Sequence, residues 1–558
     1  MTTECLPISS LPGTSAIFRD YAESGALTGA GHVTDARDTA LLRRCYPSDP
    51  FSYSWAKAAP ELSAAHRETL ATELLRQAEA HGAGEVAKAA IGKLRDGAAA
   101  VVTGQQVGLF GGPLLTLLKA ATAIRKAQEA ARISGREHVA IFWLATEDHD
   151  LAEVDMVDLP TKTEIEELKL GLKAERPVAV GGIRLDSAGK DTLDAAIDHA
   201  SELIAWGPVA ELLRECYAAE GATLASAFAR LLATVFAEFG LIVIDAASRE
   251  IHGLGASTLR AAIEQVDTLE TALLARTKEL ESAGYHAQVL VTPTHSLLFL
   301  IEENGARLPL RRVKADDGQM QWKAGSRVYT TAELLQILEA SPERLSPNAL
   351  LRAVMQDTIL PTSAYVGGPA EIAYFAQSAV VYEAILGRVT AVLPRLSATL
   401  ISPEIGKLLD THEVSFLQVV AAKTIDDLAL RLGARAMPIE GKRKIAAVGN
   451  AMDAELTALT EYMSAMSADL GRTAGISANK MRYQMDRLRR MAARFELEKE
   501  TSLRKHATAI MLELLPEGHL QERLLGGIWA LAKFGEELPG LLVEHASQEC
   551  PGHRVIRF

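Results

Sequence analysis

Cysteine and basic charge are both scarce in this sequence. The four cysteines among its 558 residues, Cys5, Cys45, Cys216 and Cys550, are far apart and form no CxxC pair. Neither a zinc knuckle nor a disulfide framework is therefore expected, and a reducing cytoplasm fits this usage. The 58 Lys and Arg residues are outnumbered by 71 Asp and Glu residues, which gives a net charge of −13. Because a general nucleic-acid binder depends on a basic surface, we expect no nucleic-acid partner.

Neither a secretory leader nor a membrane span is expected from the sequence. Its first residues carry Glu4 and early prolines in place of a basic region and an apolar core, so no signal peptide is expected. Residues 97–118 contain no charged side chain over a length close to that of a membrane span. Glycines, two glutamines and Pro113 interrupt this segment, however, and lipid could not satisfy the broken backbone. We expect a soluble, cytoplasmic chain with no membrane partner.

A glycine-rich turn between a strand and a helix is the most informative stretch. Residues 98–103 predict a buried strand, and Pro113 with the Leu and Ala run after it predicts a helix start. Glycines let the backbone approach a ligand, and free N–H groups at a helix start favour a phosphate or carboxylate. The turn matches neither GxxxxGK(S/T) nor GxGxxG, and a tight turn packed on a sheet is the alternative. The substrate-binding candidates are Thr103, Gly104, Gln105, Gln106, Gly108, Gly111 and Gly112.

A charged cluster follows the next predicted strand. Residues 138–145 form an apolar run, so the two strands and the intervening helix predict a parallel βαβ unit. The cluster Thr146, Glu147, Asp148, His149 and Asp150 would then lie at the same sheet edge as the glycine-rich turn. We expect Thr146 and Glu147 to bind substrate. We expect His149 to accept a proton, aided by Asp148 or Asp150.

Two other interpretations of this cluster stay open. Glu147 and His149 alternate along an extended segment and could share a metal ion, which would suit a metal-dependent hydrolase. Because no second cluster has ligand spacing, no metal is predicted. Alternatively, the acids could cap the next helix while His149 is a buried, hydrogen-bonded imidazole.

A polar helix face leads into a second Gly-Gly-Pro turn. Asn348, Arg352 and Gln356 recur every four residues in a predicted helix, which precedes a predicted strand at 363–366. Such a face is often only solvated, but this one is flanked by apolar residues, and Arg352 is suited to bind a carboxylate or phosphate. The substrate-binding candidates here are Asn348, Arg352, Gln356, Tyr365, Gly367, Gly368 and Glu371.

The whole pattern predicts an α/β fold with a parallel-sheet core in residues 1–400. A turn-rich N-terminal segment would wrap the core, and residues 240–245 predict another buried strand. Segments at about 160–240 and 286–345 would be insertions. They contain a predicted hairpin at 164–170 and 177–185, and predicted strands at 289–291, 296–301 and 308–313, with a turn signal at 302–305.

The last third of the chain predicts a helical arm at 401–513. Apolar residues recur there at spacings of three and four: Ile445, Val448, Met452, Leu456, Leu459, Met463, Met466 and Leu470, then Met481, Met485, Leu488, Ala492 and Phe495. The linker 471–475 would break the helix, giving an antiparallel coiled-coil hairpin. Such a hairpin usually packs on a second copy or on the main body, and we expect a homodimer. Residues 514–558, with a helix near 520–543, would pack on the core.

Three long blocks carry a resemblance to a known family. The blocks VVTGQQVGLFGGPLLTLLKAATAI, FWLATEDHDLAEVD and SPNALLRAVMQDTILPTSAYVGGPAEIAYFAQ resemble signatures of the bacillithiol-biosynthesis cysteine ligase family, BshC. The resemblance extends over essentially the whole chain. It implies a Rossmann-like core related to nucleotidylyl transferases, a coiled-coil arm that supports dimerisation, and addition of L-cysteine to glucosaminyl malate. The turn carries no HxGH histidines, unlike that of nucleotidylyl transferases.

The leading hypothesis is formation of an amide between cysteine and the amine of glucosaminyl malate. A carboxylate needs activation before it acylates an amine, so ATP or another adenine nucleotide is expected. Arg523, Trp529 and Phe534 could form a nucleotide pocket, although an aromatic helix face is more often part of a core. The alternative function is a non-catalytic scaffold that binds a sugar or nucleotide and recruits another pathway enzyme through the coiled coil.

Overall fold

The computed structural model describes residues 1–558 except 24–36, 175, 315–319 and 548–549. Parts of the expected N-terminal wrap and of both expected insertions fall in these gaps and lie outside the described residues. Among the described helices, none has the length and apolar character needed to cross a membrane.

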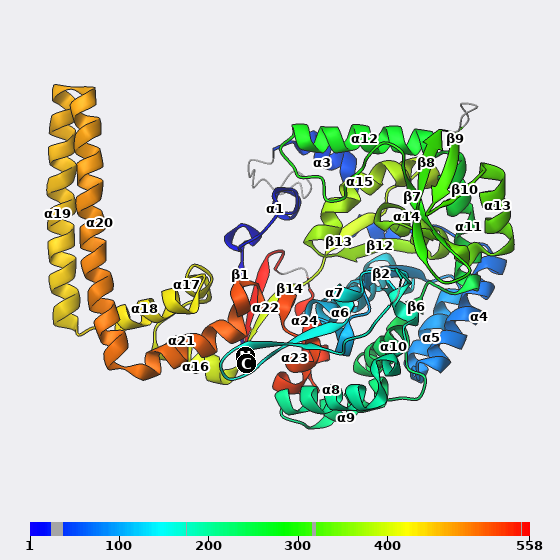
Figure 1. Ribbon diagram of the computed structural model, residues 1–558, viewed down its shortest axis with the longest axis horizontal. Coiled ribbons are helices and arrows are strands. Elements are labelled where there is room, and N and C mark those ends of the chain that lie inside the picture. Colours follow the sequence, from blue (N-terminus) through cyan, green and yellow to red (C-terminus); the bar gives the residue numbers. More distant parts are fainter. Residues whose placement is uncertain (24–36, 175, 315–319, 548–549) are drawn as a thin grey trace.

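A five-stranded parallel sheet forms the centre of the body (Figure 1). Its strands in spatial order are β13 (Ala391–Pro394), β12 (Thr362–Gly367), β2 (Ala99–Gln105), β3 (His138–Leu144) and β6 (Ile242–Asp245). Along the chain, the sheet first extends from β2 through β3 to β6. The later strands β12 and β13 are then added on the other side of β2. The order therefore reverses between β2 and β12, which is the point where ligands bind in such sheets.

Both faces of this sheet are buried, which explains why its strands are apolar without alternation. Side chains of successive residues enter two separate cores, as Val102 and Val101 do. Helices α6 (Leu115–Ser134) and α10 (Leu224–Val235) cover one face, while α14 (Ala349–Ile359) and α15 (Pro369–Leu386) cover the other. The expected parallel-sheet α/β core is confirmed.

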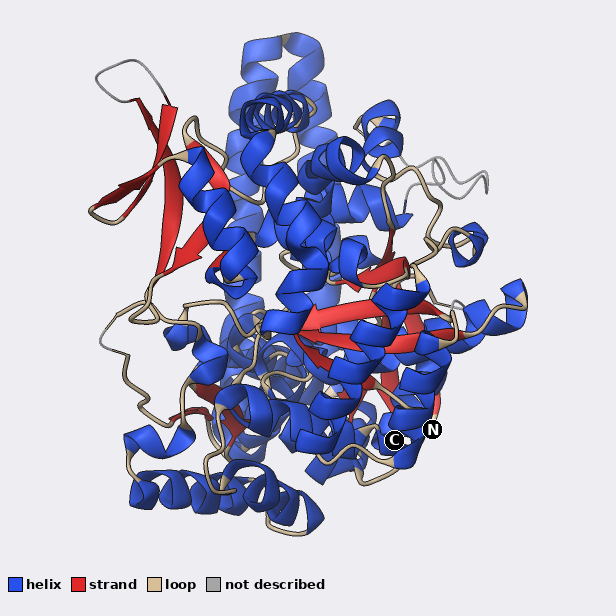
Figure 2. Cartoon of the chain, turned by 90° about the vertical axis from the view of Figure 1, so that its right-hand side faces the viewer, coloured by secondary structure: helices blue, strands red, loops and turns tan. Residues whose placement is uncertain are grey.

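A second sheet is antiparallel and stands beside the core (Figure 2). Its order is β10 (Arg327–Tyr329), β9 (Met320–Ala324), β8 (Arg307–Lys314), β7 (His295–Ile301) and β11 (Leu345–Pro347). The strands predicted at 296–301 and 308–313, and the turn between them, are confirmed. The strand predicted at 289–291 is wrong, because the backbone of Val289 is bound by the side-chain amide of Gln377.

The hairpin predicted at 164–170 and 177–185 is also wrong in its pairing. The partner of β5 (Ile165–Lys169) is the preceding strand β4 (Met156–Pro160). Residues 177–185 instead contain short 3₁₀ turns, and Gly181 there packs so closely on Thr146 that an added Cβ would lie 2.4 Å from the Thr146 Cβ. Residues 177–185 thus pack against the loop after β3 and do not pair with β5 as a strand.

The C-terminal third forms an arm that projects from the body (Figure 1). Helices α19 (Ile439–Met466) and α20 (Ala468–Lys499) form the expected antiparallel hairpin, carried on α18 (Ile425–Ala436) and α21 (Thr501–Leu514). The predicted break at 471–475 is wrong, since the helix ends at Ser467, whose backbone is extended. Gly471 lies inside α20, where an added Cβ would be 2.1 Å from the Ser464 Oγ, so it permits a close helix crossing.

The expected single helix near 520–543 is three short ones. They are α22 (Gln521–Leu524), α23 (Gly527–Phe534) and α24 (Leu538–His545). The first break occurs where Leu525 and Gly526 bridge to the main chain of Asp158 and Pro113. The second falls at Gly535, whose φ of 85° is in the left-handed region.

Further α-helices of the described chain surround the layers of the body. They include α1 (Ala16–Glu23), α3 (Thr39–Cys45), α4 (Ala64–Ala80), α5 (Glu85–Arg95), α7 (Leu151–Val154), α8 (Lys190–Leu203), α9 (Pro208–Tyr217), α11 (Arg249–Glu264), α12 (Val266–Ser282) and α13 (Thr331–Ala340). Helices α16 (Pro403–Thr411) and α17 (Phe416–Val420) instead pack against α21 at the base of the arm (Figure 1).

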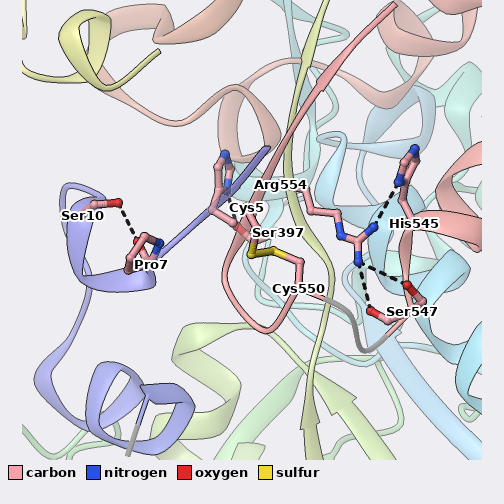
Figure 3. The surroundings of a disulfide bond; sticks show 9 residues. Cys5, Pro7, Ser10, Ser397, His545, Ser547, Cys550 and Arg554 are labelled. Carbon is pink, nitrogen blue, oxygen red and sulfur yellow. Dashed lines mark hydrogen bonds between the residues drawn. A yellow bond between two sulfur atoms is a disulfide. The ribbon is translucent and has the colours of Figure 1, made fainter. Parts of the chain in front are cut away.

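The two ends of the chain meet in a third sheet. Strand β1 (Thr2–Leu6) pairs antiparallel with β15 (His553–Arg557), which pairs parallel with β14 (Ser397–Ile401). Next to this pairing, Cys5 and Cys550 form a disulfide (Figure 3). The expectation of no disulfide is therefore wrong. A separation of 545 residues hides a contact that only the terminal sheet creates. Cys45 and Cys216 are free and buried.

We expect non-reducing peptide mapping to find one linked pair of peptides, containing Cys5 and Cys550, while Cys45 and Cys216 are alkylated after denaturation. The Cys5→Ser variant should lose about 2–4 kcal/mol of unfolding free energy, because the unfolded chain is no longer cross-linked. The Cys216→Ser variant is the control for substitution of a cysteine outside the bond. Full alkylation of all four thiols in the untreated protein would contradict this assignment.

Candidate functional site

A cavity of about 820 Å³ lies at the carboxyl ends of the parallel strands. Its wall is formed by the segments after β2, β3 and β12, with further residues from β4, the second sheet and α22. Most of the sequence-predicted residues line it: Gly104, Gln105, Gln106, Gly108, Thr146, Glu147, Asp148, His149, Asn348, Arg352, Tyr365, Gly368, Glu371 and Arg523. Three separate stretches of sequence therefore converge on one site.

Eight predicted residues lie outside the cavity lining: Thr103, Gly111, Gly112, Asp150, Gln356, Gly367, Trp529 and Phe534. The Thr103 hydroxyl is buried and donates to the carbonyl of Val366, so it links β2 to β12. Gln356 is buried and donates to Asp357. Asp150 is exposed and precedes α7 without making a side-chain cap.

The glycine-rich turn is only partly a cavity wall. Gly104 needs its hydrogen, because an added Cβ would lie 2.8 Å from the carbonyl oxygen of Trp143 on β3. Farther along, the N–H groups of Gly111 and Gly112 donate to the Tyr217 hydroxyl and to Leu109 O. Leu114 N–H donates to Leu525 O. Since these amides are satisfied within the protein, their placement favours the tight-turn interpretation for this end of the loop.

A buried ion pair joins the two helices that start beside the cavity. Lys119 on α6 lies 2.5 Å from the Glu371 carboxylate on α15, and the Lys119 side chain is 4% exposed. Its Nζ also donates to Gly104 O and Gln105 Oε1. Burial lowers the pKa of Lys119 despite the opposing effect of Glu371. Burial would raise the pKa of Glu371, but Lys119 and the Gly368 N–H hold it below its ordinary value.

Arg352 extends this network into the cavity. The guanidinium donates to the hydroxyl of Tyr374 at 3.1 Å, to that of Tyr365 at 3.4 Å and to Gln356 Oε1 at 3.2 Å. The Tyr365 hydroxyl in turn donates to Glu371 at 2.5 Å. Arg352 thus has neutral hydrogen-bond partners in the described structure, while Glu371 is paired with Lys119. This arrangement leaves a positive charge available to an anionic ligand.

Carboxylates lie on another part of the wall. Gln106 Nε2 donates to Asp148 Oδ2 at 2.9 Å and to Glu153 Oε2 at 2.7 Å, and so holds both acids in place. Asp158 on β4 is half-buried; burial, and then the charges of Glu167 and Glu517, raise its pKa to about 6. The cavity therefore has a basic and an acidic part.

Glu147 is held by a histidine from outside the cavity lining. His252 on α11 is fully buried, and its Nε2 lies 3.1 Å from Glu147 Oε1. Burial alone would lower the pKa of His252, but the negative charge of Glu147 raises it. His252 is therefore an electrostatic partner of this carboxylate at the cavity edge.

His149 faces an arginine from the second sheet. Arg307 NH1 on β8 lies 3.0 Å from His149 Nδ1, and the arginine stacks 3.7 Å above the Phe299 ring. Burial lowers the pKa of Arg307, against the effect of Glu147 and Asp148. Because His149 contacts Arg307 while Glu147 contacts His252, these two side chains do not converge on an ion. No group of three or more potential metal ligands occurs in the part of the chain that the structure describes.

The residues predicted to bind a nucleotide do not form one surface. Arg523 is exposed and lines the cavity. Trp529 is 7% exposed and packs edge-on against Phe534, which also stacks on Phe558. Trp529 belongs to a buried core that includes residues of α6, and Phe534 packs against this core, which favours the packing interpretation of this helix face.

Sequence reasoning missed Lys119, Arg307, Tyr374, Arg395 and His252. Lys119 lies near the start of α6, shortly after the glycine-rich turn. Its contact with Glu371 depends on two helices that lie on opposite faces of the sheet. Arg307 sits in an insertion, and Arg395 is paired with Glu522 at 2.7 Å across 127 residues of sequence. For Lys119 and Arg395, a charge in an otherwise apolar segment was the available signal, but it does not identify the partner.

Comparisons with known proteins agree on one family. The model described as "Bacillithiol biosynthesis BshC, N-terminal Rossmann-like domain" matches residues 1–396, and the corresponding C-terminal coiled-coil domain matches residues 398–558. A relative from Koribacter versatilis is 39% identical, and one from Solibacter usitatus is 34% identical, each over the full length of both chains. A third, from Salinibacter ruber, is 31% identical over 92% of this chain and 93% of its own. All three are named as candidate cysteine ligases, BshC.

We expect the Lys119→Met variant to lose about 3 kcal/mol or more of unfolding free energy, because it leaves the Glu371 carboxylate buried and unpaired. The double variant Lys119→Met, Glu371→Gln should recover a large part of that loss. Denaturant unfolding of the single and double variants measures the coupling. Strictly additive losses would show that the two groups do not interact in solution.

Proposed function

The chain belongs to the BshC family of bacillithiol biosynthesis, and from this premise we propose that it joins L-cysteine to glucosaminyl malate by an amide bond. The observation that supports the proposal most directly is the cavity where the strand order reverses, which combines an available guanidinium with several carboxylates. The proposed substrates carry both kinds of charge. Cysteine is a zwitterion, and glucosaminyl malate has two carboxylates and an amine.

The charge distribution suggests how the substrates are held. Arg352, with Arg523 at the edge, would bind the malyl carboxylates, since guanidinium groups pair well with carboxylates. The ammonium groups would lie toward Asp148 and Glu153. Such placement brings the amine and the acyl carbon together and converts a bimolecular encounter into a step within one complex.

Activation of the cysteine carboxylate needs a further reactant, and we propose ATP or another adenine nucleotide. Of the three residues predicted to bind it, Arg523 is on the cavity and could contact its phosphates. Trp529 and Phe534 are used in packing and do not fit a stacking role. We therefore assign no step to a nucleotide held by those rings.

The non-catalytic alternative is less well supported. A scaffold that only binds a sugar has no need for a fully buried His252 behind Glu147 or a buried lysine behind Glu371. Charges in such places are costly to bury. Their convergence on one cavity supports an enzyme.

Purified protein incubated with L-cysteine, glucosaminyl malate and ATP should form bacillithiol, detected by mass spectrometry. The Arg352→Met variant should reduce kcat/KM by about 100-fold, because a charge-assisted contact to the substrate carboxylate is lost. Arg260→Met, which removes an exposed ion pair with Glu339, is the matched control and should be unchanged. Unaltered kinetics in Arg352→Met would refute the carboxylate assignment, and parallel reactions without ATP test the cofactor.

We further propose a homodimer formed through the arm. Only part of the predicted apolar pattern closes the hairpin: Ile445, Met452, Leu456, Met463, Met485 and Ala492 are at least partly buried. The remainder forms an exposed stripe along both helices, made by Val448, Leu459, Met466, Leu470, Met481, Leu488 and Phe495. Met481, Leu488 and Phe495 keep the heptad spacing of a coiled-coil seam and are exposed among the residues that the structure describes. A second copy would supply that partner.

Light scattering coupled to gel filtration should give twice the chain mass of 59.9 kDa for the protein at micromolar concentration. The Leu488→Glu variant should give the mass of one chain, because it places a charge in the centre of the stripe. Arg490→Glu introduces the same charge on a different helix face and should remain dimeric. A monomeric wild-type protein at these concentrations would exclude the dimer.

A further inference from the structure

We infer that His149 acts in the cavity as a hydrogen-bond donor through Nε2, and that Arg307 is the positioning residue that fixes it in this state. The inference deepens the proposed function, because it changes the role that the sequence suggested for His149. It rests on the proposed ligation for its catalytic meaning, but the state of the ring can be measured without catalysis.

The contact between the two side chains determines the tautomer. Arg307 NH1 and His149 Nδ1 are 3.0 Å apart. A guanidinium has only N–H donors and keeps its charge, so the imidazole nitrogen must accept with its lone pair. A neutral imidazole that accepts at Nδ1 carries its proton on Nε2. The lone pair of Nδ1 is therefore occupied by Arg307, and Nε2 is already protonated. Neither nitrogen is then free to take a proton from an amine.

The neighbouring carboxylate does not compete for Nδ1. Asp148 Oδ1 lies 3.6 Å from His149 Nδ1, which is too long for a hydrogen bond. That oxygen instead accepts the backbone N–H of His149 at 2.7 Å, and Asp148 Oδ2 accepts from Gln106. Asp148 consequently shapes the loop and leaves the ring to Arg307.

Hydrogen bonds and stacking hold the Arg307 guanidinium in place beside His149. Its Nε donates to Ser346 Oγ at 3.2 Å and its NH2 to Pro347 O at 3.1 Å, while the plane of the group stacks on Phe299. The residue is 7% exposed. The Phe299 ring also packs against the His149 ring, with centroids 6.0 Å apart. The second sheet therefore fixes both the arginine and the imidazole.

A donor in this position has a chemical use in amide formation. His149 lines the cavity, and Nε2 has no partner among the described contacts. Attack of the amine on the acyl carbon of the activated cysteine forms the C–N bond and places negative charge on the acyl oxygen. Collapse of this adduct breaks the bond between the acyl carbon and the activating group, which leaves with the electron pair as phosphate or as a nucleotide. A fixed N–H aimed at that oxygen stabilises the charge and commonly contributes about 100- to 1000-fold in rate. The proton of the amine then passes to a carboxylate in the cavity and not to His149.

Replacement of His149 separates the donor role from the base role. Glutamine places an amide N–H near the Nε2 position but cannot accept a proton at neutral pH. We expect His149→Gln to keep kcat/KM within about tenfold of the wild type, and His149→Ala to lose about 100- to 1000-fold. If glutamine and alanine are equally inactive while both variants remain folded, the donor assignment is overturned.

Nitrogen NMR of protein labelled with ¹⁵N-histidine tests the tautomer independently of activity. The His149 signals, identified by their loss in His149→Gln, should show an unprotonated Nδ1 and a protonated Nε2. Arg307→Met should change this pattern, whereas Arg311→Met, an exposed arginine on the same strand, should not. A protonated Nδ1 in the wild type, or a pattern unaffected by Arg307→Met, would refute the inference. Should the wild type form no bacillithiol, the proposed reaction fails while this measurement still decides the tautomer.

Discussion

The ion pair between Lys119 and Glu371 is the contact on which the site depends. Helix α6 leaves the sheet after β2 and α15 leaves it after β12, so the pair joins the two faces of the sheet where the strand order reverses. The same lysine holds Gly104 O, and the same carboxylate receives the Tyr365 hydroxyl. Because Lys119 compensates the negative charge of Glu371, the positive charge of Arg352 stays available to a ligand. A buried pair of this kind sets geometry more than it adds stability.

The core sheet, the second sheet and helix α11 make different contributions to the cavity. The core sheet contributes backbone and short loops, whose positions follow from strand pairing. The second sheet contributes Arg307 and Phe299, and α11 contributes His252 from behind. The Rossmann-like core thus contributes most of the cavity wall, while Arg307 and Phe299 come from an insertion and His252 comes from a helix that covers the core.

Sequence patterns predicted the core because they are local. Apolar runs, glycine turns and helix starts identified β2, β3, β6 and β12, and with them the convergence of the 104–108, 146–149 and 348–371 segments. They failed where pairing is distant. The pattern around Val289 predicts a strand, but Gln377 binds its backbone. The pattern around Trp529 suggests a stacking residue, but its ring is packed edge-on against Phe534. The roles of Lys119, Arg307 and His252 likewise require partners that no spacing reveals.

The disulfide near the termini changes the covalent topology of the folded chain. With Cys5 bonded to Cys550, the polypeptide is a closed ring with two short tails, and the first strand is also paired to the last. A degradative machine that starts at either end must pull a doubled chain or first meet a reductant. Cutting the ring at one exposed loop would, by contrast, leave two polypeptide fragments that the disulfide still joins. In this oxidised form, residues 5–550 cannot be drawn out as a single strand until the disulfide is reduced.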